Sequence, residues 1–147
     1  MAQFGRPSAD TNNPGSYTDQ AGGGTTIYTT IDEVSYSDAD YIRSPLAPAS
    51  AVYVTKLSSV EDPVSSVGHV LRTRYAKDTA GGSTIGLVTE LRQGYVSEGT
   101  QGTLICTRTF SAIPETFTTD AYSLTTGEAD AITNYADLYV RYVANQT

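Results

Sequence analysis

Short runs in which hydrophobic and polar residues alternate recur along the chain, with glycine, proline and aspartate between them. A period of two places successive side chains on opposite faces of an extended backbone, so each run predicts a half-buried strand. Abundant threonine, valine and tyrosine favour the same structure. The expected strands are Thr25–Ile31, Asp40–Ser44, Ala51–Leu57, Gly68–Lys77, Thr84–Gln93, Thr103–Phe110, Thr116–Leu124 and Asp137–Ala144. This series is typical of an antiparallel sandwich or barrel, and the turn Asp78–Ser83 joins two of its strands.

One helical segment interrupts the strand pattern before the end of the chain. Thr125-Thr126-Gly127-Glu128 fits a capping box, in which the Thr125 hydroxyl and the Glu128 carboxylate satisfy each other's backbone donors. Ala129 and Ile132 would then share one side of a helix of about two turns. The last strand carries apolar or aromatic side chains on both faces, which predicts an inner position in a sheet.

The first 26 residues differ in composition from the rest of the chain. Phe4 is the only large aliphatic or aromatic residue before Tyr17, and the stretch contains two prolines, Pro7 and Pro14, and the triplet Gly22-Gly23-Gly24. Such a composition buries too little apolar area to order itself. We therefore expect an extended N-terminal arm at residues 1–26, held against its own domain or a neighbouring subunit, and a sandwich domain at residues 27–147.

Composition and charge exclude several classes of protein. The 147 residues suit one domain, and the formal net charge is −7, with only nine lysine and arginine residues. A nucleic acid needs clustered basic residues, so we expect no nucleic-acid partner. The apolar runs are far shorter than the ~20 residues that span a bilayer, and the N-terminus shows no signal-peptide pattern, so we expect no membrane association or export.

Catalytic chemistry finds little support in the sequence. The chain has one histidine, His69, on an expected strand, and no nucleophile motif lies near it. Its one cysteine, Cys106, also falls within an expected strand, where a buried packing role is usual. Paired carboxylates could serve acid catalysis, but no pair has the pattern of a glycosidase. We therefore expect a protein that is not an enzyme.

Acidic and aromatic residues supply the remaining candidate contacts. Asp38 and Asp40 are weak candidates for a calcium site, since calcium needs six to eight oxygen ligands and loop aspartates are common. No other cofactor is indicated. The chain has 11 tyrosines, and those in or beside loops could contact sugars or proteins. The candidate partner-binding residues are Phe4, Arg6, Pro7, Tyr17, Tyr36 and Tyr95.

The sequences of three segments resemble a module of tailed-bacteriophage and prophage virion structural proteins. They are IDEV with SDADYIRSP (residues 31–34 and 37–45), GHVLRTRY (68–75) and EADAITNYADLYVRYV (128–143). The resemblance implies a jelly-roll-like β-sandwich and carries over no catalytic residue. This chain has no tryptophan, unlike many relatives of the module, which weakens the case for sugar stacking.

The resemblance implies a virion structural protein, and similar modules occur in head decoration proteins, in tail components and as appended domains. Of these roles we expect that of a capsid decoration, or cement, protein. Such a protein would contact the major capsid protein or other virion subunits, and as a homo-oligomer, for example a trimer, it would suit a capsid lattice. Deleting residues 1–24 should then leave a folded domain that no longer joins the particle. The alternative is a tail or head-fibre adhesion module that binds host-surface glycans.

Overall fold

The computed structural model describes residues 2–79 and 83–147, and strands predominate in this part of the chain. The strands are β1 (Pro7–Asn12), β2 (Thr18–Asp19), β3 (Ile42–Arg43), β4 (Ala51–Leu57), β5 (Val70–Tyr75), β6 (Ile85–Gln93), β7 (Thr103–Phe110), β8 (Thr118–Ser123) and β9 (Leu138–Gln146). The described residues also form a short 3-10 helix, η1 (Ile27–Thr30), and an α-helix, α1 (Thr126–Asp130). The expected turn Asp78–Ser83 lies partly outside the described residues.

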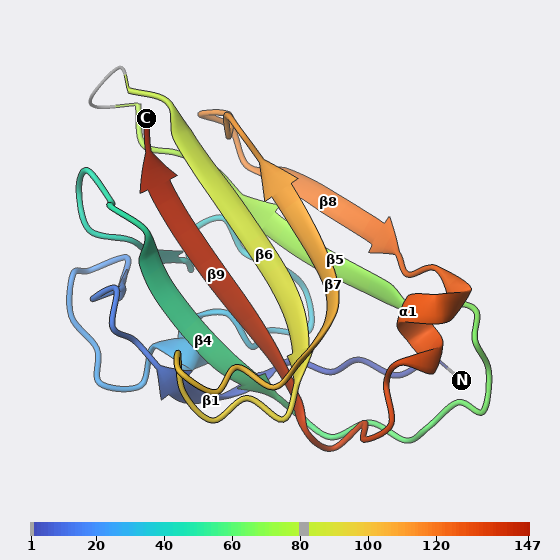
Figure 1. Cartoon of the computed structure of the whole chain (residues 1–147). Coiled ribbons are helices and arrows are strands. Elements are labelled where there is room, and N and C mark those ends of the chain that lie inside the picture. The colour runs from blue at the N-terminus through green and yellow to red at the C-terminus, as the bar shows by residue number, and fades with distance from the viewer. Residues whose placement is uncertain (1, 80–82) are drawn as a thin grey trace.

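Five strands form the main sheet in the order β1-β4-β9-β6-β7, and all neighbours are antiparallel (Figure 1). β9 lies between β4 and β6, which confirms the inner position predicted from its two apolar faces. Side chains alternate along it: Leu138 and Val140 point into the core, and Tyr139 belongs to a second buried cluster on the other face.

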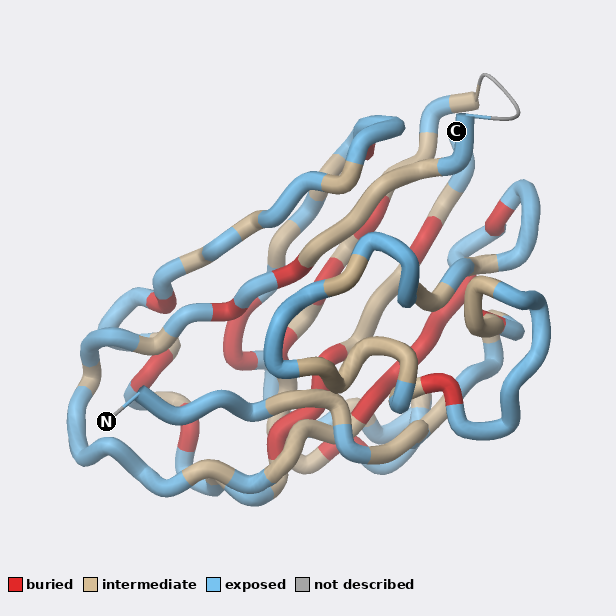
Figure 2. The backbone as a smooth tube through the Cα atoms, turned by 180° about the vertical axis from the view of Figure 1, so that it is seen from behind, coloured by how far each residue is buried: buried red, intermediate tan, exposed pale blue. Residues whose placement is uncertain are grey.

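A ribbon of β5 and β8 forms the second layer and covers one face of the main sheet. Leu71 of β5 meets Leu91 of β6 and Val140 of β9 in the core between the layers. Figure 2, seen from the ribbon side, shows buried residues along the strands of the main sheet. In the ribbon, β5 begins with alternating exposed and buried residues, and the residues of β8 are exposed or half-buried. These two antiparallel layers confirm the predicted all-β sandwich, and its jelly-roll connectivity remains a prediction.

The predicted capping box is present at the start of α1. The Thr125 hydroxyl accepts a hydrogen bond from the backbone N–H of Glu128, and the Glu128 carboxylate accepts one from the N–H of Thr125. Ala129 and Ile132 are buried on the core side, as expected. The helix spans five residues. None of the helices in the described part of the chain is long and apolar enough to cross a membrane.

The strand predicted at Thr25–Ile31 is wrong, because residues 27–30 form η1. The Asp10 carboxylate accepts hydrogen bonds from the backbone N–H groups of Ile27 (2.7 Å) and Tyr28 (2.9 Å). These two bonds satisfy donors at the start of a helical turn, where an acidic side chain is favourable. A contact from a distant strand therefore overrides the local preference of β-branched residues for extended backbone.

The N-terminal arm is held against its own domain. Residues 7–12 form β1, which pairs with β4 at one edge of the main sheet. Next to it, the N–H of Gly15 donates to the carbonyl of Val52 (2.8 Å), and a side chain at Gly15 would overlap the Val52 backbone. A boundary at residue 26 therefore does not separate the arm from the sandwich, because β1 is one of the strands of its sheet.

Candidate partner-binding surface

An arginine at the end of the ribbon ties a distant loop to the second layer. Arg74 of β5 donates from Nε and Nη2 to the two carboxylate oxygens of Asp38, at 2.6 and 2.7 Å. Its Nη1 donates to the Thr119 hydroxyl of β8 at 2.9 Å. This two-point geometry matches the planar guanidinium to the planar carboxylate. It fixes the loop that contains Asp38 against the outside of the ribbon.

Aromatic rings surround this ion pair. The guanidinium carbon of Arg74 lies 4.2 Å from the ring centre of Tyr36 and 5.5 Å from that of Phe117. The rings of Tyr41 and Phe117 are 5.9 Å apart. Tyr36 is nonetheless 72% exposed. We call these residues the aromatic–arginine face; it consists of Tyr36, Asp38, Tyr41, Arg74, Phe117 and Thr119.

Each group of the ion pair within the face favours the charged form of the other. Hydrogen bonds from Arg74 lower the pKa of the Asp38 carboxyl below its ordinary value, and the pKa of Arg74 is raised in return. Both groups therefore stay charged at neutral pH. Aromatic residues and arginine are enriched at protein interfaces. Side chains that are already ordered before binding lose little conformational freedom when a partner contacts them.

The face continues along the outside of the ribbon. Val70 and Arg72 project there from β5, opposite Ser123 and Ala121 of β8, and all four are exposed. Val70 is 40% exposed. None of the ion pairs in the described part of the chain includes Arg72. This arginine is therefore available to an acidic group of a partner.

Of the tyrosines proposed as contacts, Tyr36 alone is exposed. Tyr17 is 7% exposed, packs 5.7 Å from Tyr53, and donates its hydroxyl to the carbonyl of Ala51. Tyr95 is 3% exposed, and its hydroxyl donates to Glu98 and accepts from Asn12. Both rings pack in the interior, because their loops fold back onto the main sheet and bury them.

The arm residues proposed as contacts lie at the end of β4. The backbone of Arg6 exchanges hydrogen bonds with Ser58, and Pro7 lies opposite Leu57. Phe4 is 54% exposed, with the Arg6 guanidinium 5.1 Å from its ring centre. Phe4 thus remains accessible, whereas Arg6 and Pro7 are half-buried at the sheet edge.

The two aspartates proposed for calcium, Asp38 and Asp40, form hydrogen bonds with different side chains. Both oxygens of Asp38 accept from Arg74, and Asp40 accepts a long hydrogen bond of 3.5 Å from Gln20. Among the described residues, no cluster of three or more histidine, cysteine or acidic side chains could hold a metal ion. A calcium ion at Asp38 would have to displace the arginine.

The residues considered for catalysis have packing partners. The Nε2 atom of His69 lies 2.7 Å from the Tyr135 hydroxyl, and the two rings are 5.8 Å apart. Cys106 is buried and free, as expected, and burial raises the pKa of its thiol to about 11. The thiol is therefore protonated at neutral pH and is a poor nucleophile.

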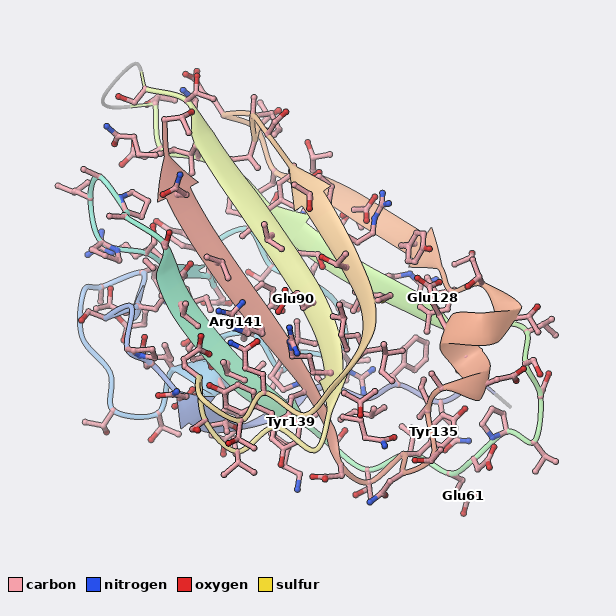
Figure 3. All side chains as sticks on the ribbon, viewed as in Figure 1. Glu61, Glu90, Glu128, Tyr135, Tyr139 and Arg141 are labelled. Atoms are coloured by element: carbon pink, nitrogen blue, oxygen red, sulfur yellow. The ribbon has the colours of Figure 1, made fainter. Side chains whose placement is uncertain are left out.

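A second polar cluster lies on the other face of the main sheet. Arg141 of β9 is bound by Glu90 of β6 (3.1 Å) and by Glu98 of the following loop (2.6 Å), and Figure 3 shows Glu90 and Arg141 close together. Arg92 donates to Glu90 from the same strand at 2.8 Å. The cluster holds residues 95–101 over the sheet, so its role is to fasten this loop.

Sequence reasoning missed Arg74, Tyr41 and Phe117. Arg74 pairs with Asp38 of a loop that lies 36 residues away, rather than with an acid on a neighbouring strand. Spacing along the chain carries no signal for such a contact.

No family model, curated protein or solved structure matches this chain.

Proposed function

We propose that this chain is a bacteriophage virion structural protein, a capsid decoration protein that docks on the shell without performing chemistry. The observation that carries the proposal is how the segments that resemble the phage module meet in space. They are distant in sequence, yet direct contacts join them to one another.

Two side-chain pairs and a shared core make these connections. Asp38 of the first segment binds Arg74 of the second, and His69 of the second binds Tyr135 of the third. Leu71 of the second packs with Ile132 and other residues of the third. The segments that resemble the phage module therefore contain residues that hold the layers of the sandwich together. A module defined by its structure needs such residues, so their position supports the resemblance.

The aromatic–arginine face is the surface on which we place the contact with the major capsid protein. It combines the exposed ring of Tyr36 and the half-buried rings of Tyr41 and Phe117 with an arginine. Tyrosine and arginine are among the residues that contribute most to binding energy at interfaces. The exposed Phe4 adds a second contact from the arm. Many copies bound to one shell would make individually weak contacts collectively strong. The protein would then be found in the virion, after synthesis in the host cytoplasm.

The number of copies per particle tests this proposal. Purified particles are digested, and peptides of this chain are quantified by mass spectrometry against those of the major capsid protein. A shell protein is present in a fixed, near-stoichiometric ratio to the capsid protein. Absence of the chain from purified particles would overturn the proposal.

A copy number far below that of the capsid protein would favour the alternative, a tail or head-fibre adhesion module. The observation that supports this alternative is Tyr36, which is 72% exposed beside the polar groups of Asp38 and Arg74. A ring next to hydrogen-bonding groups is a common arrangement in ligand sites. A glycan array with and without calcium, using Tyr36→Ala as the matched variant, would detect such binding.

A further inference from the structure

The two edges of the main sheet differ in how well they are protected from further pairing. At one edge, β1 begins with Pro7, which has no backbone N–H, and its pairing with β4 is interrupted by two register shifts. Proline and irregularities are devices that prevent strands from adding to an edge. The β1 edge is therefore closed to an incoming strand.

The opposite edge, β7, has few such devices. It is eight residues long and contains no lysine, proline or glycine. Its single irregularity is the extra residue Ile105, near its start, where Leu104 and Cys106 pair with successive residues of β6. Apart from its pairing with β6, no backbone hydrogen bond between described residues involves residues 103–110. An unpaired row of donors and acceptors along a regular strand is a template for another strand.

The charges on β7 do not oppose such pairing. Its one charged residue, Arg108, lies on the core side and is held by both carboxylate oxygens of Asp120, at 2.9 and 3.1 Å. On the opposite side, Thr107 and Thr109 are exposed and neutral, and Leu104 is 45% exposed. A strand added here would cover apolar surface and meet no unpaired charge.

We propose that two copies of this chain associate through β7, with the two strands antiparallel about a two-fold axis. The occupant of the edge is a second copy because an antiparallel pair of identical strands satisfies both edges at once. A closed ring of three copies joined through the edges of this sheet would need β7 of one copy to pair with β1 of the next, and β1 is protected. This association goes beyond the proposed function and does not depend on it.

The sequence of β7 also selects a register. A two-fold axis perpendicular to the sheet places one residue opposite itself. Centring on Arg108 would put two guanidinium groups opposite each other, which is unfavourable. Centring on Thr107 instead places it opposite the partner's Thr107 on the exposed face, and paired threonines are favourable neighbours across strands. The two Arg108 side chains are then offset, and each keeps its Asp120.

Charge variants at Thr107 test both the surface and the register. The mass of the full chain is measured by analytical ultracentrifugation over a range of concentrations in about 0.15 M salt, where repulsion between the acidic copies is screened. We expect a concentration-dependent dimer for the wild-type chain. Thr107→Lys and Thr107→Glu each place like charges opposite each other and should weaken the dimer by roughly tenfold or more.

The decisive sample is an equimolar mixture of Thr107→Lys and Thr107→Glu, because opposite charges then face each other and a mixed dimer should form. Thr107→Val keeps the strand shape and should dimerise like the wild type, and circular dichroism verifies that each variant is folded. A monomeric wild-type chain at every concentration overturns the proposal. So does a dimer that is insensitive to both charges, or a mixture that remains monomeric. These results leave the copy number in the virion, and hence the proposed function, untouched.

Discussion

Two threonines of the main sheet are equally buried but differ in what their hydroxyl groups meet. Thr55 and Thr89 are both 0% exposed. The Thr55 hydroxyl donates to the carbonyl of Ala9 at 2.9 Å, whereas that of Thr89 has no hydrogen-bond partner among the described residues. Removing an unsatisfied buried hydroxyl is favourable, so Thr89→Val should raise the free energy of unfolding by about 1 kcal/mol. Thr55→Val should lower it by about 1 kcal/mol. Urea denaturation of both variants checks the opposite signs.

Arg141 is the centre of the charged cluster over β6 and β9. Its side chain is 13% exposed, and that of Glu90 is 14% exposed. Arg141→Met would leave the Glu98 carboxylate without its guanidinium partner and Glu90 with Arg92 alone. We therefore expect a loss of roughly 2 kcal/mol in unfolding free energy. The matched control is Arg72→Met, an exposed arginine outside the described ion pairs, which should change stability by less than about 0.5 kcal/mol. Equal effects of the two substitutions would contradict the role given to the cluster.

The same cluster predicts a pH dependence. Hydrogen bonds from Arg141 lower the pKa of the Glu98 carboxyl in the folded state, against a smaller effect of burial. A carboxyl with a lowered folded-state pKa stabilises the fold above its ordinary pKa, and this contribution is lost as the pH falls through the lowered value. The stability difference between wild type and Arg141→Met should therefore be constant near neutral pH and shrink in acid. Denaturation at a series of pH values measures it, and a difference that grows in acid would show that the sign is wrong.

At the scale of elements, the sequence predicted those parts whose cause is local. The alternation in β4 and β7 and the capping box before α1 each lie within a few consecutive residues, and each appears in the structure at the expected place. The strand prediction for residues 25–31 failed because the hydrogen-bond acceptors for η1 come from Asp10 of β1, and no local sequence pattern reveals this contact. For the same reason, the composition of the arm did not reveal that β1 would find a partner in β4.

Asp10 connects β1, η1 and β4, and its removal should loosen all of them. Besides the two η1 donors, its carboxylate accepts a hydrogen bond of 2.5 Å from the hydroxyl of Tyr53, a residue that is 0% exposed. Asp10→Ala leaves these donors without an acceptor, so we expect a loss of about 2 kcal/mol or more in unfolding free energy. Asp40→Ala, at an exposed loop aspartate, is the control and should have little effect. Thermal unfolding followed by circular dichroism compares the two variants.

For the whole molecule, the sequence predicted the two-layer sandwich but not the surface that it presents. Period-two patterns identify which residues are buried, whereas the aromatic–arginine face depends on where the loop around Asp38 lies relative to the ribbon. Tyr36 could be named in advance because it is aromatic and lies in a loop. Arg74 and Phe117 could not, because strand position alone does not distinguish a solvent-facing arginine from one that orders a binding surface.

The position of β1 in the sheet changes what a truncation of the arm can show. Deleting residues 1–24 would remove β1 and Asp10 with it, so loss of particle binding could simply reflect unfolding. Deleting residues 2–6 removes Phe4 and Arg6 but leaves β1 paired with β4. We expect this shorter deletion to remain folded and to bind particles more weakly, because an exposed ring and its neighbouring guanidinium are lost. Deletion of residues 2–12 should lower the unfolding temperature, because it exposes the edge of β4. Co-sedimentation with particles that lack the protein, together with thermal unfolding, separates the two effects. If the chain without residues 2–6 binds as well as the full chain, the arm makes no contact with the particle and the docking surface lies elsewhere.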